Sequence, residues 1–163
     1  MDTVVPALLA VPACAEERDF LRNVFSASGW KIHLAQTFQE VRAAIREQGV
    51  GVLLSESQFS DGHCWKDLLG EIRRLESPPM LVVTDRLADE RLWAEVLNLG
   101  GYDVLLKPFD PAELLRVVSS AWMSWKLKGA KSRRRWPWDG LGRGWGVGLS
   151  PNPPAQYPLG ELW

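Results

Sequence analysis

The sequence has little of what several classes of protein require. Its 163 residues contain two cysteines, Cys14 and Cys64, too few for the disulfide framework of a small secreted domain. Two cysteines and two histidines without ligand spacing are weak evidence for a metal centre or a redox pair, so we interpret both thiols as reduced. No apolar run reaches the roughly 18 residues that a membrane-spanning helix needs. These absences favour a cytoplasmic domain without a membrane span.

The amino terminus has some features of an export signal and lacks others. Residues 4–15 are apolar and include an Ala-Cys-Ala motif at 13–15 that looks like a cleavage site. However, Asp2 replaces the positive charge that such signals require, and Pro6 and Pro12 interrupt the apolar run. We therefore expect the protein to stay in the cytoplasm.

Charge is nearly balanced in total but unevenly distributed. The formal net charge is −1, yet residues 126–163 hold seven Lys and Arg against two acidic residues, which leaves residues 1–125 acidic. A nucleic-acid-binding domain usually carries a basic surface. We therefore expect no nucleic-acid binding from the acidic part itself.

Short apolar runs alternate with helical patterns over residues 6–125. Runs that are apolar on both faces are typical of parallel strands covered by helices. Two of the helical patterns begin with clear capping signals, Thr37 followed by Glu40, and Asp110 followed by Pro111. The runs are 7–11, 30–35, 50–54, 80–84 and 103–106, and the helical patterns are 16–28, 38–48, 65–76, 88–99 and 111–125. This order predicts an α/β fold, a doubly wound (βα)₅ three-layer sandwich.

The pattern fails after Trp125. Residues 126–163 contain seven Gly, five Pro and four Trp without a helical or strand period. We predict a folded domain over residues 6–125 and a largely disordered tail over 126–163. Two alternatives stay open for the basic, Trp-containing segment 133–138: a contact with nucleic acid or a membrane surface, or an unselected extension.

Three of the predicted strands lead to polar side chains. Val52 begins the strand that reaches Glu56, the fourth strand ends at Thr84, and the fifth leads to Lys107. The carboxyl ends of parallel strands meet at one edge of the sheet, where open α/β sheets bind their ligands. We therefore expect the acid, the hydroxyl and the amine to lie together.

These residues resemble the receiver domain of two-component response regulators. The resemblance covers about residues 6–122 and depends on Phe-Ser-Asp-Gly at 59–62, Val-Val-Thr at 82–84, and Lys-Pro-Phe-Asp-Pro-Ala-Glu-Leu-Leu at 107–115. It implies a flavodoxin-like fold with strand order 2-1-3-4-5, a cis Lys107–Pro108 bond, and signalling proteins as partners.

The phosphorylation site departs from the family pattern. In receiver domains an aspartate accepts the phosphoryl group, an acidic pair holds Mg²⁺, and a Thr or Ser and a Lys bind the phosphate. Thr84 and Lys107 match the last two roles, whereas the acceptor position falls on Glu56 and the acidic pair on Pro12 and Ala13. Proline and alanine offer no side-chain oxygen to Mg²⁺. We therefore expect no Mg²⁺ binding, no useful phosphorylation and no enzymatic activity.

Several interpretations of the site residues remain open. Glu56 could accept phosphate, imitate the phosphorylated form by its own charge, or form an ion pair with Lys107. The nearest acids, Glu16 and Glu17, fall in the first turn of the following helix, so a displaced acidic pair is an alternative.

The switching aromatic of the family falls on Val104. Tyr102 lies two residues earlier, and the period of a strand predicts that it shares a face with Val104. Asp85, directly after Thr84, adds negative charge at the mouth of the crevice.

We therefore predict a degenerate receiver-like module that acts by protein–protein interaction. The expected surface combines helix 88–99, strand 103–106 and helix 111–125, which in the family mediates dimerisation and output, so a homodimer is one expected assembly. The alternative is a working phosphorelay receiver that accepts a phosphoryl group near Glu56.

One argument for this surface comes from the last helix. Its apolar residues exceed what one core-facing stripe needs, and surplus apolar surface indicates an interface. The residues concerned are Val117, Val118, Trp122 and Trp125.

Overall fold

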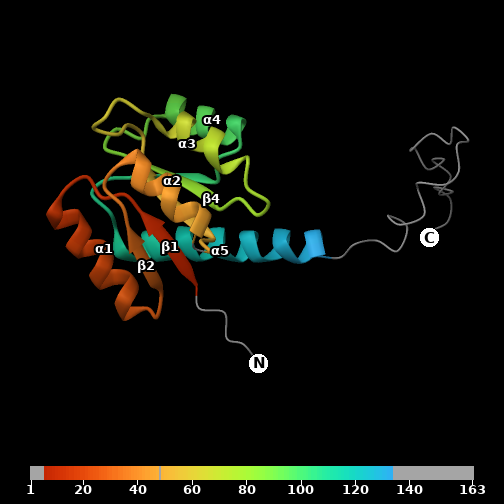
Figure 1. Ribbon diagram of the computed structural model, residues 1–163. Coiled ribbons are helices and arrows are strands. Elements are labelled where there is room, and N and C mark those ends of the chain that lie inside the picture. Colours follow the sequence, from red (N-terminus) through yellow and green to blue (C-terminus); the bar gives the residue numbers. More distant parts are fainter. Residues whose placement is uncertain (1–5, 48, 134–163) are drawn as a thin grey trace, which may run out of the picture.

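The computed structural model describes residues 6–47 and 49–133, in which strands and helices alternate (Figure 1). Residues 134–163, most of the predicted tail, lie outside the described residues. The strands are β1 (Ala7–Ala10), β2 (Lys31–Leu34), β3 (Val52–Glu56), β4 (Met80–Asp85) and β5 (Asp103–Leu106). The helices are α1 (Ala15–Ala27), α2 (Phe38–Glu47), α3 (Trp65–Ile72), α4 (Glu90–Leu99) and α5 (Pro111–Arg133).

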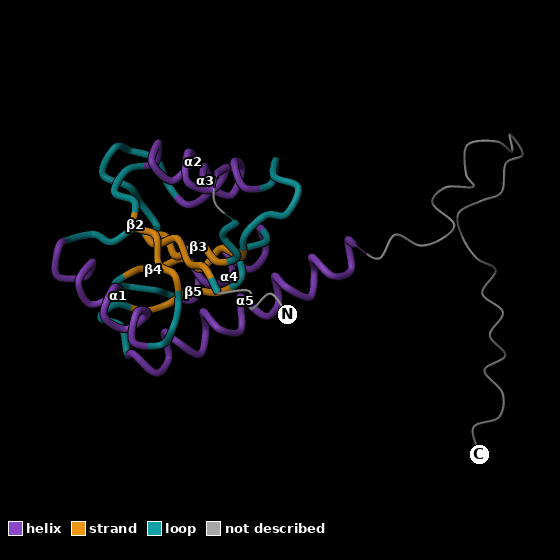
Figure 2. Tube along the Cα trace, turned by 60° about the horizontal axis from the view of Figure 1, so that its bottom comes forward, coloured by secondary structure: helices purple, strands orange, loops and turns teal. Residues whose placement is uncertain are grey.

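The strands form one parallel sheet in the order β2-β1-β3-β4-β5. Helices α1 and α5 cover one face of the sheet, and α2, α3 and α4 cover the other, which the two views in Figures 1 and 2 show together. The predicted doubly wound three-layer sandwich is confirmed.

Alternating side chains on the central strands build a core on each face of the sheet. In β1, Leu9 packs toward the α2–α3–α4 layer and Leu8 toward the α1–α5 layer, and both are fully buried. Burial of a leucine side chain contributes roughly 1.5–3 kcal/mol, so the continuous apolar strands identified in the sequence are what hold the layers together.

Capping residues begin and end the helices where the sequence indicated. The Thr37 hydroxyl accepts a hydrogen bond from the Glu40 backbone N–H at 3.2 Å, although the Glu40 carboxylate reaches back to the N–H of Gln36 rather than to that of Thr37. Asp110 caps α5 by accepting from the Glu113 N–H at 3.1 Å. Gly100 ends α4 with φ = 103°, a backbone conformation that favours glycine.

Two element boundaries differ from the prediction by more than two residues. Helix α3 ends at Ile72 rather than 76, and turns lead from it to Pro78, where the preceding residue is restricted to extended backbone. Helix α5 continues to Arg133 rather than ending at Trp125. Its added turns contain good helix formers and a single glycine, and the first following proline is Pro137, so local propensity overrides the average composition of the tail.

The aromatic residues of α5 are mainly core residues, which corrects the argument for a surplus apolar stripe. Val117, Val118 and Trp122 are 2%, 0% and 6% exposed. Trp122 packs edge-on against Trp30, with ring centroids 5.9 Å apart, and stacks with Trp125 at 4.9 Å. The wide stripe is needed because α5 crosses the sheet and continues beyond its edge (Figure 1).

Gly51, just before β3, makes this packing possible. A Cβ atom at this position would lie 2.4 Å from two ring carbons of Trp122 and 2.8 Å from the ring of Trp125. No real Cβ contact is so short, so any side chain here would push α5 away from the sheet.

Among residues 6–47 and 49–133, no helix is both long and apolar enough to cross a membrane.

Candidate functional site

The structure brings together the three polar residues that the sequence placed at the carboxyl edge of the sheet. Glu56 and Thr84 are partners in the parallel register of β3 and β4, and the Lys107 N–H donates to the Asp85 carbonyl at 3.0 Å. Side chains of Glu56, Thr84 and Lys107 line one crevice of about 700 Å³, together with Ala13 and other residues of these strand ends.

The Lys107 ammonium is the centre of this crevice. Its side chain is 7% exposed, and its Nζ contacts Glu56 Oε1 as well as both carboxylate oxygens of Glu17, at 2.9 and 3.0 Å. The ion pair expected between Glu56 and Lys107 is therefore present. A buried cation requires such partners, because an unpaired buried charge is strongly destabilising.

Glu17 binds Lys107, a contact that the sequence did not predict. It lies in the first turn of α1, where a negative charge is stabilised by the helix dipole, and its side chain is 16% exposed. The sequence kept Glu16 and Glu17 as a displaced acidic pair. The structure separates them, since Glu16 is exposed and Glu17 binds Lys107. Its position in the first turn of the helix that follows β1 places Glu17 near the carboxyl edge of the sheet, but does not specify its partner.

The residues present do not fit a magnesium site. Pro12 and Ala13 have no side-chain oxygen, and the two nearest carboxylates, of Glu17 and Glu56, already bind the Lys107 ammonium. Mg²⁺ needs near-octahedral oxygen coordination. Within the described part of the chain, no group of three His, Cys, Asp or Glu side chains is arranged to hold a metal ion.

The Thr84 hydroxyl lies beneath the crevice. Thr84 is 2% exposed, and its Oγ1 donates to the carbonyl of Ser55 at 3.3 Å. A hydroxyl that is bonded to the neighbouring strand would have to give up this contact before it could donate to a phosphate.

Val104 and Tyr102 lie on opposite faces of the sheet, so the expectation of a shared face is wrong. Val104 is half-buried and packs against the α2–α3–α4 core, whereas Tyr102 packs against the α1–α5 core. Tyr102 precedes β5, which begins at Asp103, so the alternation of a strand does not apply to it.

Asp85 organises the loop between β4 and α4. Burial alone would raise its pKa, but hydrogen bonds from the Ser57 hydroxyl and from the N–H groups of Leu87 and Ala88, together with the nearby Lys107 charge, hold the pKa of Asp85 below its usual value. Ala88 has φ = 36°, an uncommon conformation for alanine that these bonds maintain. Asp85 therefore stays ionised at neutral pH and adds a further negative charge to the crevice wall.

The two cysteines are separate and free. Cys14 is exposed at the start of α1, and Cys64 is half-buried at the start of α3, where its N–H donates to the Asp67 carboxylate at 2.9 Å.

The Lys107–Pro108 peptide bond is cis, as expected.

The family of this chain follows from its sequence as well as from its fold. The family described as "Response regulator receiver domain" matches residues 15–119, well over half of the chain. The chain belongs to this family and is a receiver domain of two-component signalling.

Solved structures of receiver domains share the fold. The receiver domain of the Francisella response regulator 1452 is similar with a TM-score of 0.66 and 20% identity, over 73% of this chain and 98% of the other. A CheY-like receiver domain protein from Methanospirillum hungatei gives a TM-score of 0.68 at 18% identity, over 76% and 98%. NtrX from Brucella abortus, solved in complex with ADP, gives a TM-score of 0.72 at 22% identity, over 81% of this chain and 30% of that chain. No curated protein matches the sequence.

Proposed function

We propose that this receiver domain acts by binding other signalling proteins, without phosphorylation, Mg²⁺ or catalysis. The observation that carries the proposal is the engagement of Lys107 by two carboxylates, Glu56 and Glu17. The phosphate-binding amine that the family resemblance implies is thereby already neutralised within the protein.

The charge of the crevice supports the same conclusion. Glu17, Glu56 and Asp85 bring three carboxylates around one ammonium. A phosphoryl group on Glu56 would replace the single carboxylate charge by about two negative charges and would compete with Glu17 for Lys107. Because divalent cations normally offset this charge in phosphoryl transfer, and because the residues do not fit one, the transfer would be strongly disfavoured.

A surface for partners lies on α4 and β5. Trp93, Leu97 and Leu106 are 49%, 39% and 54% exposed, so apolar side chains of both elements face solvent on the surface proposed from the sequence. The Trp93 indole N–H donates to the Asp103 carboxylate at 3.2 Å, which fixes the ring in its exposed position. Held aromatic rings are typical anchors of protein interfaces.

Phosphorylation is tested by incubation with a small phosphodonor and Mg²⁺, followed by intact mass measurement. We expect no phosphoryl adduct and no rise of the melting temperature with Mg²⁺, because a ligand stabilises a protein only by binding its native state. A stoichiometric adduct that disappears in Glu56→Gln would instead establish the phosphorelay alternative.

The surface is tested by Trp93→Glu. Sedimentation of the wild-type chain over a concentration series measures self-association, and pull-down measures partners. We expect Trp93→Glu to weaken either association at least tenfold, as loss of an aromatic anchor usually does. Asn23→Glu is the control, because Asn23 is exposed on α1, which the proposed surface does not include.

A further inference from the structure

Helix α4 carries Trp93 but is anchored to the core by few residues. Among its ten residues, only Val96 is fully buried, and Leu92 packs partly against the core. By contrast, Val118 and Trp122 of α5 are both buried in the opposite layer. Because buried apolar packing supplies most of what holds a helix in place, the position of α4 depends more strongly on polar contacts at its two ends.

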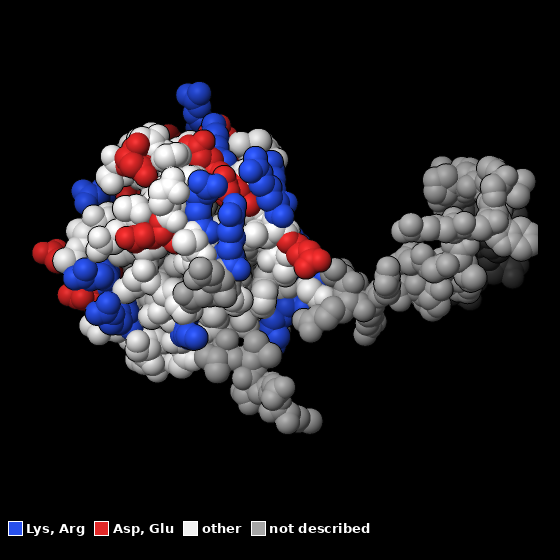
Figure 3. Space-filling model, in the orientation of Figure 1, with Lys and Arg blue, Asp and Glu red and all other residues white. Residues whose placement is uncertain are grey.

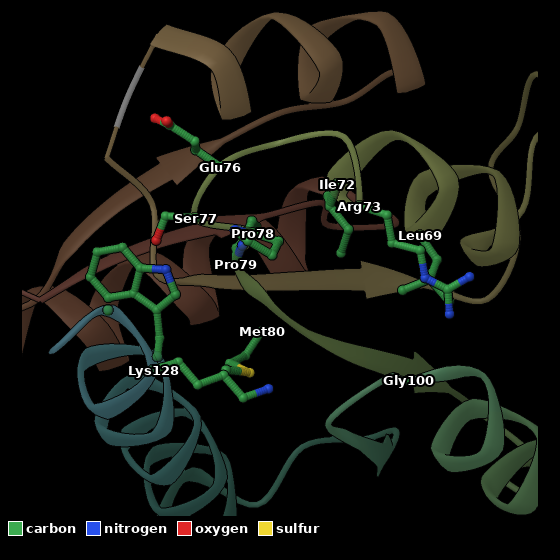
Figure 4. Close-up of a pocket in the computed structure, with 12 residues that line it drawn as sticks. Leu69, Ile72, Arg73, Glu76, Ser77, Pro78, Pro79, Met80, Gly100 and Lys128 are labelled. Carbon is green, nitrogen blue, oxygen red and sulfur yellow. The ribbon is translucent and has the colours of Figure 1, made fainter. Parts of the chain in front are cut away.

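The carboxyl-terminal end of α4 is held by α3. The Arg73 guanidinium donates to the Leu99 carbonyl, and Figure 4 shows the Arg73 side chain extending from α3 toward Gly100, where α4 ends. About one turn earlier, Glu95 forms an exposed ion pair with Lys66 of α3. Figure 3 shows acidic and basic side chains interspersed over the layer that α2, α3 and α4 form. This end of α4 therefore has its own attachment to α3.

The amino-terminal end of α4 depends on Asp85. Residues 86–89 alone connect the end of β4 to α4. The Asp85 carboxylate accepts hydrogen bonds from the N–H of Leu87 at 2.8 Å and, more weakly, from that of Ala88 at 3.4 Å. Leu87 is 82% exposed, so its side chain contributes little apolar packing to the connection. The conformation of the connection is therefore set mainly by one carboxylate.

The same carboxylate is anchored to the loop that follows β3. It accepts a hydrogen bond from the Ser57 hydroxyl. Ser57 is itself fixed, because its N–H donates to the Thr84 carbonyl and its own carbonyl accepts from the Trp65 N–H, both at 3.1 Å. Trp65 begins α3 and is buried. Asp85 therefore joins the start of α4 to the start of α3.

The connection between β4 and α4 is also strained. Ala88 has φ = 36°, in the left-handed region that residues other than glycine rarely adopt. Such a conformation persists only where the surrounding contacts impose it. Without the Asp85 carboxylate, Ala88 can return to a negative φ. Because the connection is short, this change would reorient the first turn of α4, which bears Trp93, while Arg73 holds the other end.

We propose that Asp85 is a positioning residue that holds the strained connection and thereby keeps α4, with Trp93, in one orientation. The positioning concerns the free protein, whereas its consequence for binding rests on the proposed function of the α4 and β5 surface. A surface that is ordered before binding loses less entropy when a partner binds. Asp85 thus sets the affinity of this surface from within the chain.

The first test follows the indole N–H signal of Trp93 by NMR in the full-length protein, with Trp93→Phe to assign it. We expect Asp85→Ala to shift this signal, and Ser57→Ala to shift it less in the same direction, because it removes one contact of the carboxylate. Asp85→Asn should leave the signal near its wild-type position, since the amide oxygen still accepts from the two N–H groups. Signals of wild type and Asp85→Ala at the same position would overturn the proposal.

A second test uses the strain at Ala88. Ala88→Val should give the shift of Asp85→Ala even with Asp85 present, because a β-branched residue strongly disfavours a positive φ. Combining Asp85→Ala with Ala88→Gly should move the signal back toward wild type, because glycine adopts a positive φ readily. If the added glycine leaves the shifted signal where it was, the strained connection does not transmit the change and the proposal fails.

A control at the same edge of the sheet tests whether the effect is specific to Asp85. Asp110→Ala also removes a capping carboxylate, but at the start of α5, and it should leave the Trp93 signal unchanged. An equal shift in that variant would count against the proposal, because the loss of any cap would then act on Trp93 in the same way.

Association measurements separate this proposal from the proposed function. We expect Asp85→Ala to weaken self-association or the capture of partners by about fivefold, the lower end of typical coupling between sites. A shifted Trp93 signal with undiminished association would contradict the proposed surface and support the positioning role. An unshifted signal would contradict the positioning role, whatever the association.

Discussion

The two edges of the sheet are stabilised by different interactions. At the carboxyl edge, three strand ends and the first turn of α1 gather charged groups, and Lys107 is neutralised by Glu17 and Glu56. At the amino edge, aromatic rings of α5 pack directly over the backbone of Gly51. The first arrangement depends on paired charges and the second on close packing.

The difference indicates which edge of the sheet depends on ion pairs and which depends on close packing, and therefore where each kind of substitution should act. At the carboxyl edge, Glu17 and Glu56 leave no charge uncompensated on Lys107, so the fold can accommodate its buried ammonium. Four substitutions, from the largest expected effect to the smallest, break one edge or the other.

Gly51→Ala should be the most destabilising, by about 3 kcal/mol, since the added methyl group would overlap the ring of Trp122 and force α5 to shift. Urea unfolding measures the loss. Gly49→Ala is the control, because a Cβ atom there meets nothing within 4 Å. Equal free energies for the two variants would show that α5 does not rest on Gly51.

Lys107→Ala should destabilise by about 2 kcal/mol, because it leaves two partly buried carboxylates facing each other. Adding Glu56→Gln should recover part of the loss in a double-mutant cycle. Lys66→Ala is the control, as it removes an exposed pair with Glu95 worth at most about 0.5 kcal/mol. If the double variant recovers none of the lost stability, the conclusion is that Lys107 and Glu56 do not interact.

Thr84→Val should cost about 1 kcal/mol, the net value of the hydrogen bond from its hydroxyl to the Ser55 carbonyl. Valine has nearly the same shape, so packing stays comparable. Thermal and urea unfolding give the difference, and an unchanged stability would mean that the hydroxyl makes no net contribution.

Asp85→Asn should have the smallest effect, and it should depend on pH. The pKa of Asp85 is lowered in the folded protein, so its contribution is fully present above the unfolded pKa of about 3.9 and is lost as the pH falls through the lower folded value. The free energy of unfolding of wild type should therefore exceed that of the variant by less than about 1 kcal/mol at pH 6. This difference should shrink toward pH 3. Asn23→Ala, at an exposed position that does not titrate, is the control for effects of pH on the rest of the protein.

The sequence predicted most of the fold because the fold is encoded in local patterns. Apolar runs such as the one ending at Thr84 became strands, and the signal at Asp110 became a helix cap. The end of α5 was misplaced because an average over 38 residues concealed the helix-forming residues up to Arg133. The prediction that Tyr102 shares a face with Val104 was wrong because the alternation of a strand was extended to a residue outside the strand.

The site was only half predictable, for a physical reason. Glu56, Thr84 and Lys107 follow strands whose edge is set by topology, so their proximity could be inferred. Glu17 reaches Lys107 through the direction of α1 and its own rotamer, which no spacing in the sequence specifies. The exposure of Trp93 and burial of Trp122 likewise depend on how the helices lie on the sheet.

The ammonium of Lys107, held between acids from two distant segments, has a consequence for how such a protein could carry information. A receiver that awaits a phosphoryl group reports the activity of a kinase. We propose that a receiver whose counter-ion is part of its own chain has no such input at this position. Under the proposed function, its influence on a pathway scales with how many molecules the cell makes and how many partners compete for them.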